Sequence, residues 1–237
     1  MGMASRAEPI VTGRYYHVMN RGVEKRITFI DDQDYQRFLS ILAYYQHEKP
    51  PISYSQRFRL KIQPLGLDVH DWGPKLVDIV SYCLMPNHFH LLLQQCVDGG
   101  IPLFLGRVTN SYTRAFNTRN HRIGSLFQGV YKSVGIYSNE QLVHVVRYHH
   151  LNPMVAQLAP TASDYQWSSH RAYLKPSYPT PGVGYEKEIR SRAEIMITPD
   201  VVRQQFGTPN SFNAFVNDHA SYADSLALIK RLILEES

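Results

Sequence analysis

The chain has 237 residues, of which 43% are hydrophobic and 19% charged, a balance that excludes a disordered, collagenous or coiled-coil protein. Its length suits one core of about 150 to 180 residues with an appendage. Lys and Arg outnumber Asp and Glu by 25 to 20. The resulting net charge of +5 favours a polyanionic partner such as nucleic acid without establishing one.

Cysteine usage and the N-terminal sequence bear on the compartment. Cys83 and Cys96 lie inside apolar stretches and form no CxxC pair, so neither a disulfide framework nor a cysteine zinc site is expected. The N-terminal MGMASRAEP lacks the apolar core of a signal peptide, and no apolar run reaches the roughly 18 residues that a membrane span needs. We expect a protein of the reducing cytoplasm with no membrane partner.

The first part of the chain alternates extended and helical patterns. Residues 14–30 indicate two short extended runs separated by a turn at 20–22, and the apolar spacing in 33–47 predicts an amphipathic helix. Residues 48–75 contain several prolines and glycines with a basic stretch, and we interpret them as an inserted loop or hairpin. Residues 76–84 are apolar on both faces, as in a central strand.

The elements after this strand complete an α+β pattern. We expect Asn152 and Pro153 to end the last helix, because proline removes a backbone donor. The order of elements predicts a ferredoxin-like antiparallel sheet with helices, centred on the strands over 76–84 and 88–95. The four further elements are a strand over 88–95, a helix over 102–118, a strand over 130–136 and a helix over 139–151.

Composition also suggests how the chain is divided. The segment PSYPTPGVG after Lys175 is typical of a linker, and the residues beyond it have helical patterning. We therefore predict a main domain over 1–175 that includes the 48–75 insertion, a linker over 176–197 and a small C-terminal helical appendage over 198–237.

A histidine pair on a predicted strand is the first candidate for chemistry. His88 and His90 are two residues apart, and because side chains alternate along a strand, both imidazoles point to one face and can reach one cation. Phe89, Leu91 and Leu93 take the opposite face. The chain has 11 histidines, so the pair alone is equally consistent with a structural or solvent-facing role, and a further ligand must support it.

The predicted helix over 139–151 offers such residues. At about 100° per residue, its side chains should separate into a buried stripe and a flank. A tyrosine on the flank need not belong to the core, although most of the 16 tyrosines should pack at core edges. The buried stripe comprises Leu142, Val145, Val146 and His149, and the flank comprises His144, Tyr148 and Asn152.

Four sequence blocks resemble, in order, the single-tyrosine HUH transposases of the REP-associated tyrosine transposase group. The resemblance extends over residues 13 to about 174, and the LMPNHFH stretch is its most specific part. The blocks are YHVMNRGVEKRITFIDDQDYQRFL, YCLMPNHFHLLL, NSYTRAFNTRNHRIGSLFQGVYKS and VVRYHHLNPMVAQL.

The resemblance implies an HUH endonuclease fold and a bacterial, nucleoid-associated enzyme. It implies that His88 and His90 bind a divalent metal, Mg²⁺ or Mn²⁺, and that Tyr148 is the nucleophile. Asn152 matches the position of the third metal ligand, where the insertion-sequence branch of the family has a glutamine. The implied reaction is transesterification on single-stranded DNA, at a hairpin or palindrome, through a 5′-phosphotyrosine intermediate. The protein would be a monomer or homodimer.

The residues add detail to this expectation. No GxxxxGK[ST] motif is present, so no nucleotide cofactor is expected. A phenol has a pKa of about 10 and needs a proton acceptor or a stabilised phenolate. His144, one turn before Tyr148, is the candidate acceptor, and the metal is the alternative.

Basic residues could form a phosphate track on elements that the fold is expected to bring to one side. For each of them taken singly, a solvated surface position is the more common role. The candidate DNA-binding residues are Arg21, Arg107, Arg114, Arg119 and Lys132.

Two other functions remain open. A domesticated, non-cutting protein that binds DNA hairpins would retain the fold and the basic track without the nucleophile. A metal-dependent hydrolase would use His88 and His90 but attack with water instead of Tyr148.

Overall fold

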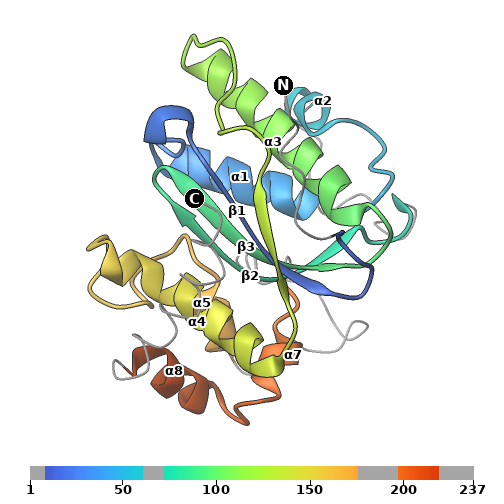
Figure 1. The fold of residues 1–237 in the computed structure, drawn as a ribbon. Helices are drawn as coiled ribbons and strands as arrows, with labels where there is room; N and C mark the ends of the chain where they lie inside the picture. Colours follow the sequence, from blue (N-terminus) through green and yellow to red (C-terminus); the bar gives the residue numbers. More distant parts are fainter. Residues whose placement is uncertain (1–8, 61–71, 176–196, 219–237) are drawn as a thin grey trace.

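The computed structural model describes residues 9–60, 72–175 and 197–218 (Figure 1). Four strands form one antiparallel sheet in the order β2-β3-β1-β4. The strands are β1 (Tyr15–Arg21), β2 (Val77–Met85), β3 (His88–Gln95) and β4 (Lys132–Ile136).

The two strands predicted at the centre of the sheet form a tight hairpin, but only β3 is central, because β2 is an edge strand in the order β2-β3-β1-β4. Only Pro86 and Asn87 separate β2 from β3, and Met85 pairs with His88 across the turn. On its other side β3 pairs with β1, so that Arg21 lies opposite His88 and Met19 opposite His90. The strand that carries the histidine pair is therefore held between two neighbours.

Helices cover both faces of this sheet (Figure 1). On one face lie α1 (Asp32–Tyr44) and α3 (Gly100–Arg119), and on the other lies α4 (Asn139–Val155). In the core under α1 and α3, the Phe38 ring lies 5.1 Å from Phe89 and 5.0 Å from Tyr112. The order β1-α1-β2-β3-α3-β4 with this strand order is ferredoxin-like, which confirms the predicted fold class.

Two local predictions are wrong. No second strand follows Gly22: the chain forms a short 3-10 helix, η1 (Val23–Lys25), and the backbone N–H groups of Thr28 and Phe29 donate to the Pro86 carbonyl. Pro153 does not end α4. It lies in the last turn, where its missing N–H removes only one backbone bond, and the Ala156 N–H still donates to the Asn152 carbonyl at 3.0 Å.

The predicted insertion over 48–75 is described in part. It contains a short helix, α2 (Tyr54–Arg59), and residues 61–71 lie outside the described part of the chain. Its two ends meet next to α1, since the Glu48 N–H donates to the Pro74 carbonyl and the Trp72 ring packs 5.0 Å from Tyr44.

The described residues after α4, 156–175 and 197–218, pack on the same side as that helix (Figure 1). The Thr198 N–H donates at 2.8 Å to the carbonyl of Ile79, a residue of the edge strand β2. Phe212 is buried and stacks on Tyr173 at a centroid distance of 4.7 Å. The elements involved are α5 (His170–Tyr173), α7 (Asp200–Arg203) and α8 (Pro209–Asn217).

The proposed division into domain, linker and appendage stays a prediction, because residues 176–196 and 219–237 lie outside the described part of the chain. None of the described helices is long and apolar enough to cross a membrane.

Phe212 provides a test of how firmly the segment after residue 197 is attached. Phe212→Ala should lower the free energy of unfolding by about 3 to 5 kcal/mol, because it removes a buried ring and leaves a cavity. Denaturant unfolding of the full chain measures this. The control is Val130→Ala, whose side chain is 74% exposed. Equal stability of the two variants would show that α8 is not packed as described.

Candidate functional site

The histidine pair lies on the face of the sheet that α4 covers. The rings of His88 and His90 have centroids 4.9 Å apart, whereas Phe89 between them packs on Phe127 in the opposite core. The predicted alternation along this strand is therefore confirmed. His90 is 2% exposed, and it is close to α4, since its ring lies 5.4 Å from that of Tyr148.

The residue before the pair orients the first imidazole. His88 Nδ1 lies 2.6 Å from Asn87 Oδ1, an acceptor, so Nδ1 carries the proton and Nε2 is left with a lone pair. Asn87 is itself held, because its Nδ2 donates to the Lys25 carbonyl at 3.2 Å. Burial, and then the positive charge of Arg21, lowers the pKa of His88 to about 4. The ring is therefore neutral at pH 7, as a metal ligand must be.

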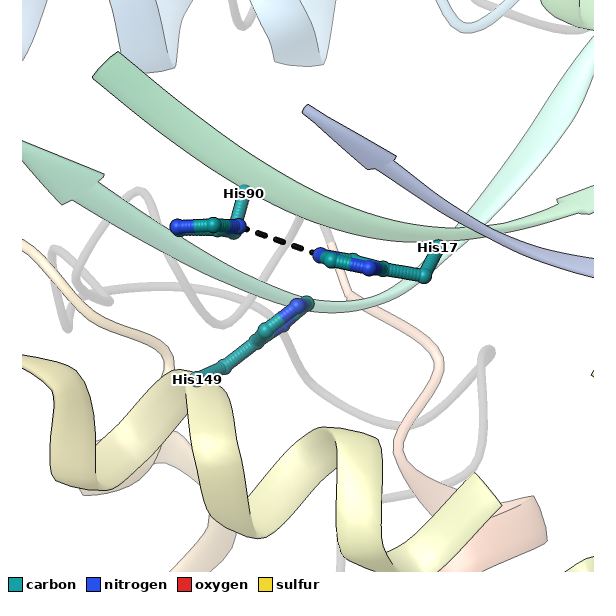
Figure 2. A group of neighbouring side chains, drawn as sticks. All are labelled: His17, His90 and His149. Atoms are coloured by element: carbon teal, nitrogen blue, oxygen red, sulfur yellow. Dashed lines mark hydrogen bonds between the residues drawn. The ribbon is translucent and has the colours of Figure 1, made fainter. Parts of the chain in front are cut away.

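His90 belongs to a second group of histidines that comes from three elements (Figure 2). His17 of β1 and His149 of α4 lie beside it, and His90 Nδ1 is 3.1 Å from His17 Nε2. All three side chains are buried, and burial is the main cause that lowers the pKa of each. For His17 the pKa falls to about 4.

Residues on α4 follow the predicted division. The stripe that was expected to be buried is buried, and His149 points into the protein. His144, Tyr148 and Asn152 are each half-buried on the flank. Burial raises the pKa of Tyr148, and the Asn152 amide one turn further along opposes part of this rise.

The site therefore contains a phenol next to imidazoles. Tyr148 lies edge-on to His90 and, at 6.2 Å between centroids, to His17. The positive charge of Arg21 further favours the phenolate form of Tyr148. His144, the candidate proton acceptor, has its ring 5.7 Å from Phe215 of α8.

The donor atoms fit a divalent cation. His90 Nε2 is buried and has no hydrogen-bond partner among the described residues, and buried polar atoms in this state are rare in folded proteins. Asn152 would bind a cation through its amide oxygen, because the amide nitrogen has no lone pair to share. Because His88 also presents Nε2, two imidazoles and an amide are available as ligands. The assignment of His88, His90 and Asn152 as metal ligands, and of Tyr148 as nucleophile, stays a prediction.

Two of the predicted basic residues lie close to this group. Arg21 is next to His88 in the sheet, and its Nε is buried without a hydrogen-bond partner in the described structure. Lys132 begins β4, is exposed, and pairs with Met19 of β1.

The other three belong to α3, which covers the opposite face of the sheet from α4 (Figure 1). Arg107 donates to the Glu48 carbonyl at 2.8 Å, and Arg119 forms an ion pair with Asp34 at 3.0 Å and another with Asp31. Arg114 is exposed and lines, with Arg107, a hollow of about 430 Å³. The expectation that all five basic residues lie on one side is therefore wrong for Arg107, Arg114 and Arg119.

Sequence reasoning did not predict the part of His17 in this group. Because side chains alternate along β1, the sequence indicates that His17 and Val18 point to opposite faces. Only the register of β1 against β3, in which Met19 pairs with His90, places His17 beside the histidine pair. The helical period predicts an inward position for His149 and no ligand.

The chain has a ferredoxin-like sheet with an HxH pair on a central strand, covered by a helix that carries a tyrosine, and this agrees with the HUH fold that the resemblance implies. The chain is similar to a solved structure described as a REP-associated tyrosine transposase bound to a REP hairpin. The TM-score is 0.54 at 15% sequence identity, with 79% of this chain and all of the other covered. This confirms the resemblance at the level of the fold. No protein-family model and no curated protein matches the sequence.

The buried histidines make a prediction about pH. In the metal-free protein, the unfolded chain protonates His17 near its ordinary pKa of 6.5, whereas the folded chain resists protonation until about pH 4. Stability should therefore fall as the pH falls through this window, by about 1.4 kcal/mol per pH unit for one such histidine. His17→Gln removes this contribution.

The measurement is the free energy of unfolding in denaturant with a chelator present, at several pH values between those two limits. A plot of unfolding free energy against pH should be less steep for His17→Gln than for the parent, because the variant takes up about one proton fewer on unfolding. Parallel curves for the two proteins would contradict the neutral state of buried His17.

Proposed function

We propose that this protein is a metal-dependent endonuclease and strand transferase that acts on single-stranded DNA through Tyr148. The observation that carries the proposal is the position of the Tyr148 ring, 5.4 Å from His90, with Asn152 one turn further along the same helix. A nucleophile, two neutral imidazoles and an amide thus meet in one place. The structural similarity to a transposase bound to a DNA hairpin supports a hairpin substrate.

The chemistry assigned to Tyr148 is a single transesterification. Its phenolic oxygen attacks the phosphorus of the scissile phosphodiester, the bond to the 3′ oxygen breaks, and DNA remains attached through a 5′-phosphotyrosine. The phenol loses its proton, and the leaving 3′ oxygen gains one. Attack by another 3′-hydroxyl reverses the step without an external energy source, because the phosphotyrosine conserves the bond.

Arg21 assists the ionisation of the phenol, since its charge favours the phenolate, whereas burial opposes it. A divalent cation held by His88, His90 and Asn152 would polarise the scissile phosphate and offset the charge that develops on its oxygens. Asn87 keeps His88 in the tautomer that this requires, through the 2.6 Å contact to Nδ1. His144 remains our candidate for the proton acceptor.

The two other functions differ in their products. A non-cutting hairpin-binding protein would bind DNA and leave it intact, and a hydrolase would cut DNA without becoming attached to it. The placement of Tyr148 beside His90 favours covalent chemistry over both.

The decisive test is covalent capture. Tyr148→Phe should abolish the protein–DNA adduct on a denaturing gel and leave hairpin binding nearly unchanged, because only the hydroxyl is lost. The matched control is Tyr112→Phe, whose hydroxyl donates to the Thr28 carbonyl in the core far from α4. An adduct that persists in Tyr148→Phe, or that never forms with the parent and Mg²⁺ or Mn²⁺, would refute the proposal.

DNA binding should depend on salt. For single strands, the slope of log affinity against log salt is about −0.7 per phosphate contact, so four contacts give a slope of about −3. Lys132→Gln should flatten the slope by about 0.7 while cleavage of saturating substrate stays the same. Fluorescence anisotropy of a labelled hairpin measures the slope.

Arg114→Gln provides the matched comparison on the opposite face of the sheet. An equal change in this variant would extend the DNA contact to α3, and no change would restrict the contact to the side of Lys132. If binding by the parent protein did not depend on salt, this result would contradict the proposed contacts between basic residues and DNA phosphates.

A further inference from the structure

The histidines between α4 and the sheet offer more nitrogen ligands than one cation needs. His17, His90 and His149 come from β1, β3 and α4, and one ring nitrogen of each lies within 4.8 Å of the other two (Figure 2). Their exposed fractions are 2%, 2% and 0%. Three imidazoles that converge in a buried place are not required by the fold, since apolar side chains would fill it at lower cost.

The hydrogen bonds show which edge of each ring faces the group. His149 Nδ1 lies 2.8 Å from Ser81 Oγ, so its Nε2 is the remaining nitrogen, and that atom is buried without a hydrogen-bond partner among the described residues. His90 turns Nδ1 toward His17 Nε2, and its Nε2 is the nitrogen left for a cation shared with His88. His90 therefore has one nitrogen available to each of two groups.

We propose that His17, His90 and His149 form a second cation site, distinct from the one at His88 and Asn152. A zinc ion binds imidazole nitrogen at about 2.0 to 2.1 Å, which places two ligands of a tetrahedral ion about 3.4 Å apart. The pair formed by His17 and His90 is already spaced at 3.1 Å. A ring nitrogen of His149 lies within 4.8 Å of both. The fourth position is left to water.

The donor set selects the kind of ion. The group supplies three nitrogens and no carboxylate, which suits Zn²⁺, Co²⁺ or Ni²⁺ and disfavours Mg²⁺ and Ca²⁺, because these prefer oxygen ligands. Ser81 acts as the outer partner that orients His149, a role that in other metal sites changes affinity by about 10- to 100-fold.

Sharing His90 has a consequence for the proposed function, on which this step rests. When His90 Nδ1 binds zinc, the proton of the neutral ring must be on Nε2, and Nε2 then cannot bind a cation together with His88. Occupancy of the second site would therefore exclude the ion at His88, and zinc would inhibit strand cleavage.

Cobalt titration of the full chain tests the site by itself, because tetrahedral Co²⁺ absorbs visible light. The parent and His88→Ala should bind one Co²⁺ with this absorption and similar affinity. His149→Gln and His17→Gln should each lose at least about tenfold in affinity, and Ser81→Ala about tenfold. Circular dichroism establishes whether each variant is folded. Because both His17→Gln and His149→Gln are measured, the test remains valid if one of them does not fold.

Two outcomes would overturn the second site: no cobalt absorption in the parent, or absorption that is lost in His88→Ala and retained in both His17→Gln and His149→Gln. The sharing of His90 is tested by adduct formation in Mg²⁺ with and without Zn²⁺, each protein compared with its own zinc-free rate. Zinc should inhibit the parent and not His17→Gln, and equal inhibition of both would refute the sharing. A parent that forms no adduct even without zinc refutes the proposed function alone, and the cobalt result still decides the site.

Discussion

The alternation of side chains along β3 is the constraint on which the rest of this structure depends. Phe89, Leu91 and Leu93 are buried in the core under α1 and α3, and this burial requires His88 and His90 to face α4. A slip of one residue would place two imidazoles in an apolar core and three apolar side chains under α4. The tight turn at Pro86 and Asn87 and the pairing with β1 prevent that slip.

The second feature is how the protein tolerates so many buried imidazoles. Burial lowers the pKa of His17 and His88 to about 4, so both are neutral at pH 7 and the cost of burying a charge is avoided. Neutral imidazole is also the form that binds metals. The same burial that removes charge from the core therefore leaves donor nitrogens available, with Asn87 and Ser81 orienting two of the rings.

The position of α4 decides what these nitrogens face. The helix brings Tyr148 and His149 to the sheet on successive residues, one on the flank and one in the interior. Its side away from the sheet is packed by α8, since the Phe215 ring lies against His144 and 4.8 Å from the Arg147 guanidinium carbon. A change in α8 is therefore expected to act on the site through α4.

The sequence by itself determined the order of the four strands and of the three long helices, the face occupied by His88 and His90, and the separation of His149 from Tyr148 on their helix, because these depend on the periodicities of a strand and a helix. Only the tertiary structure decided that His17 lies beside His90, that Arg119 is paired with Asp31 and Asp34, and that α3 and α4 lie on opposite faces. Such contacts join residues far apart in the chain. They depend on strand register and on the packing of helices, which local patterns of residues do not specify.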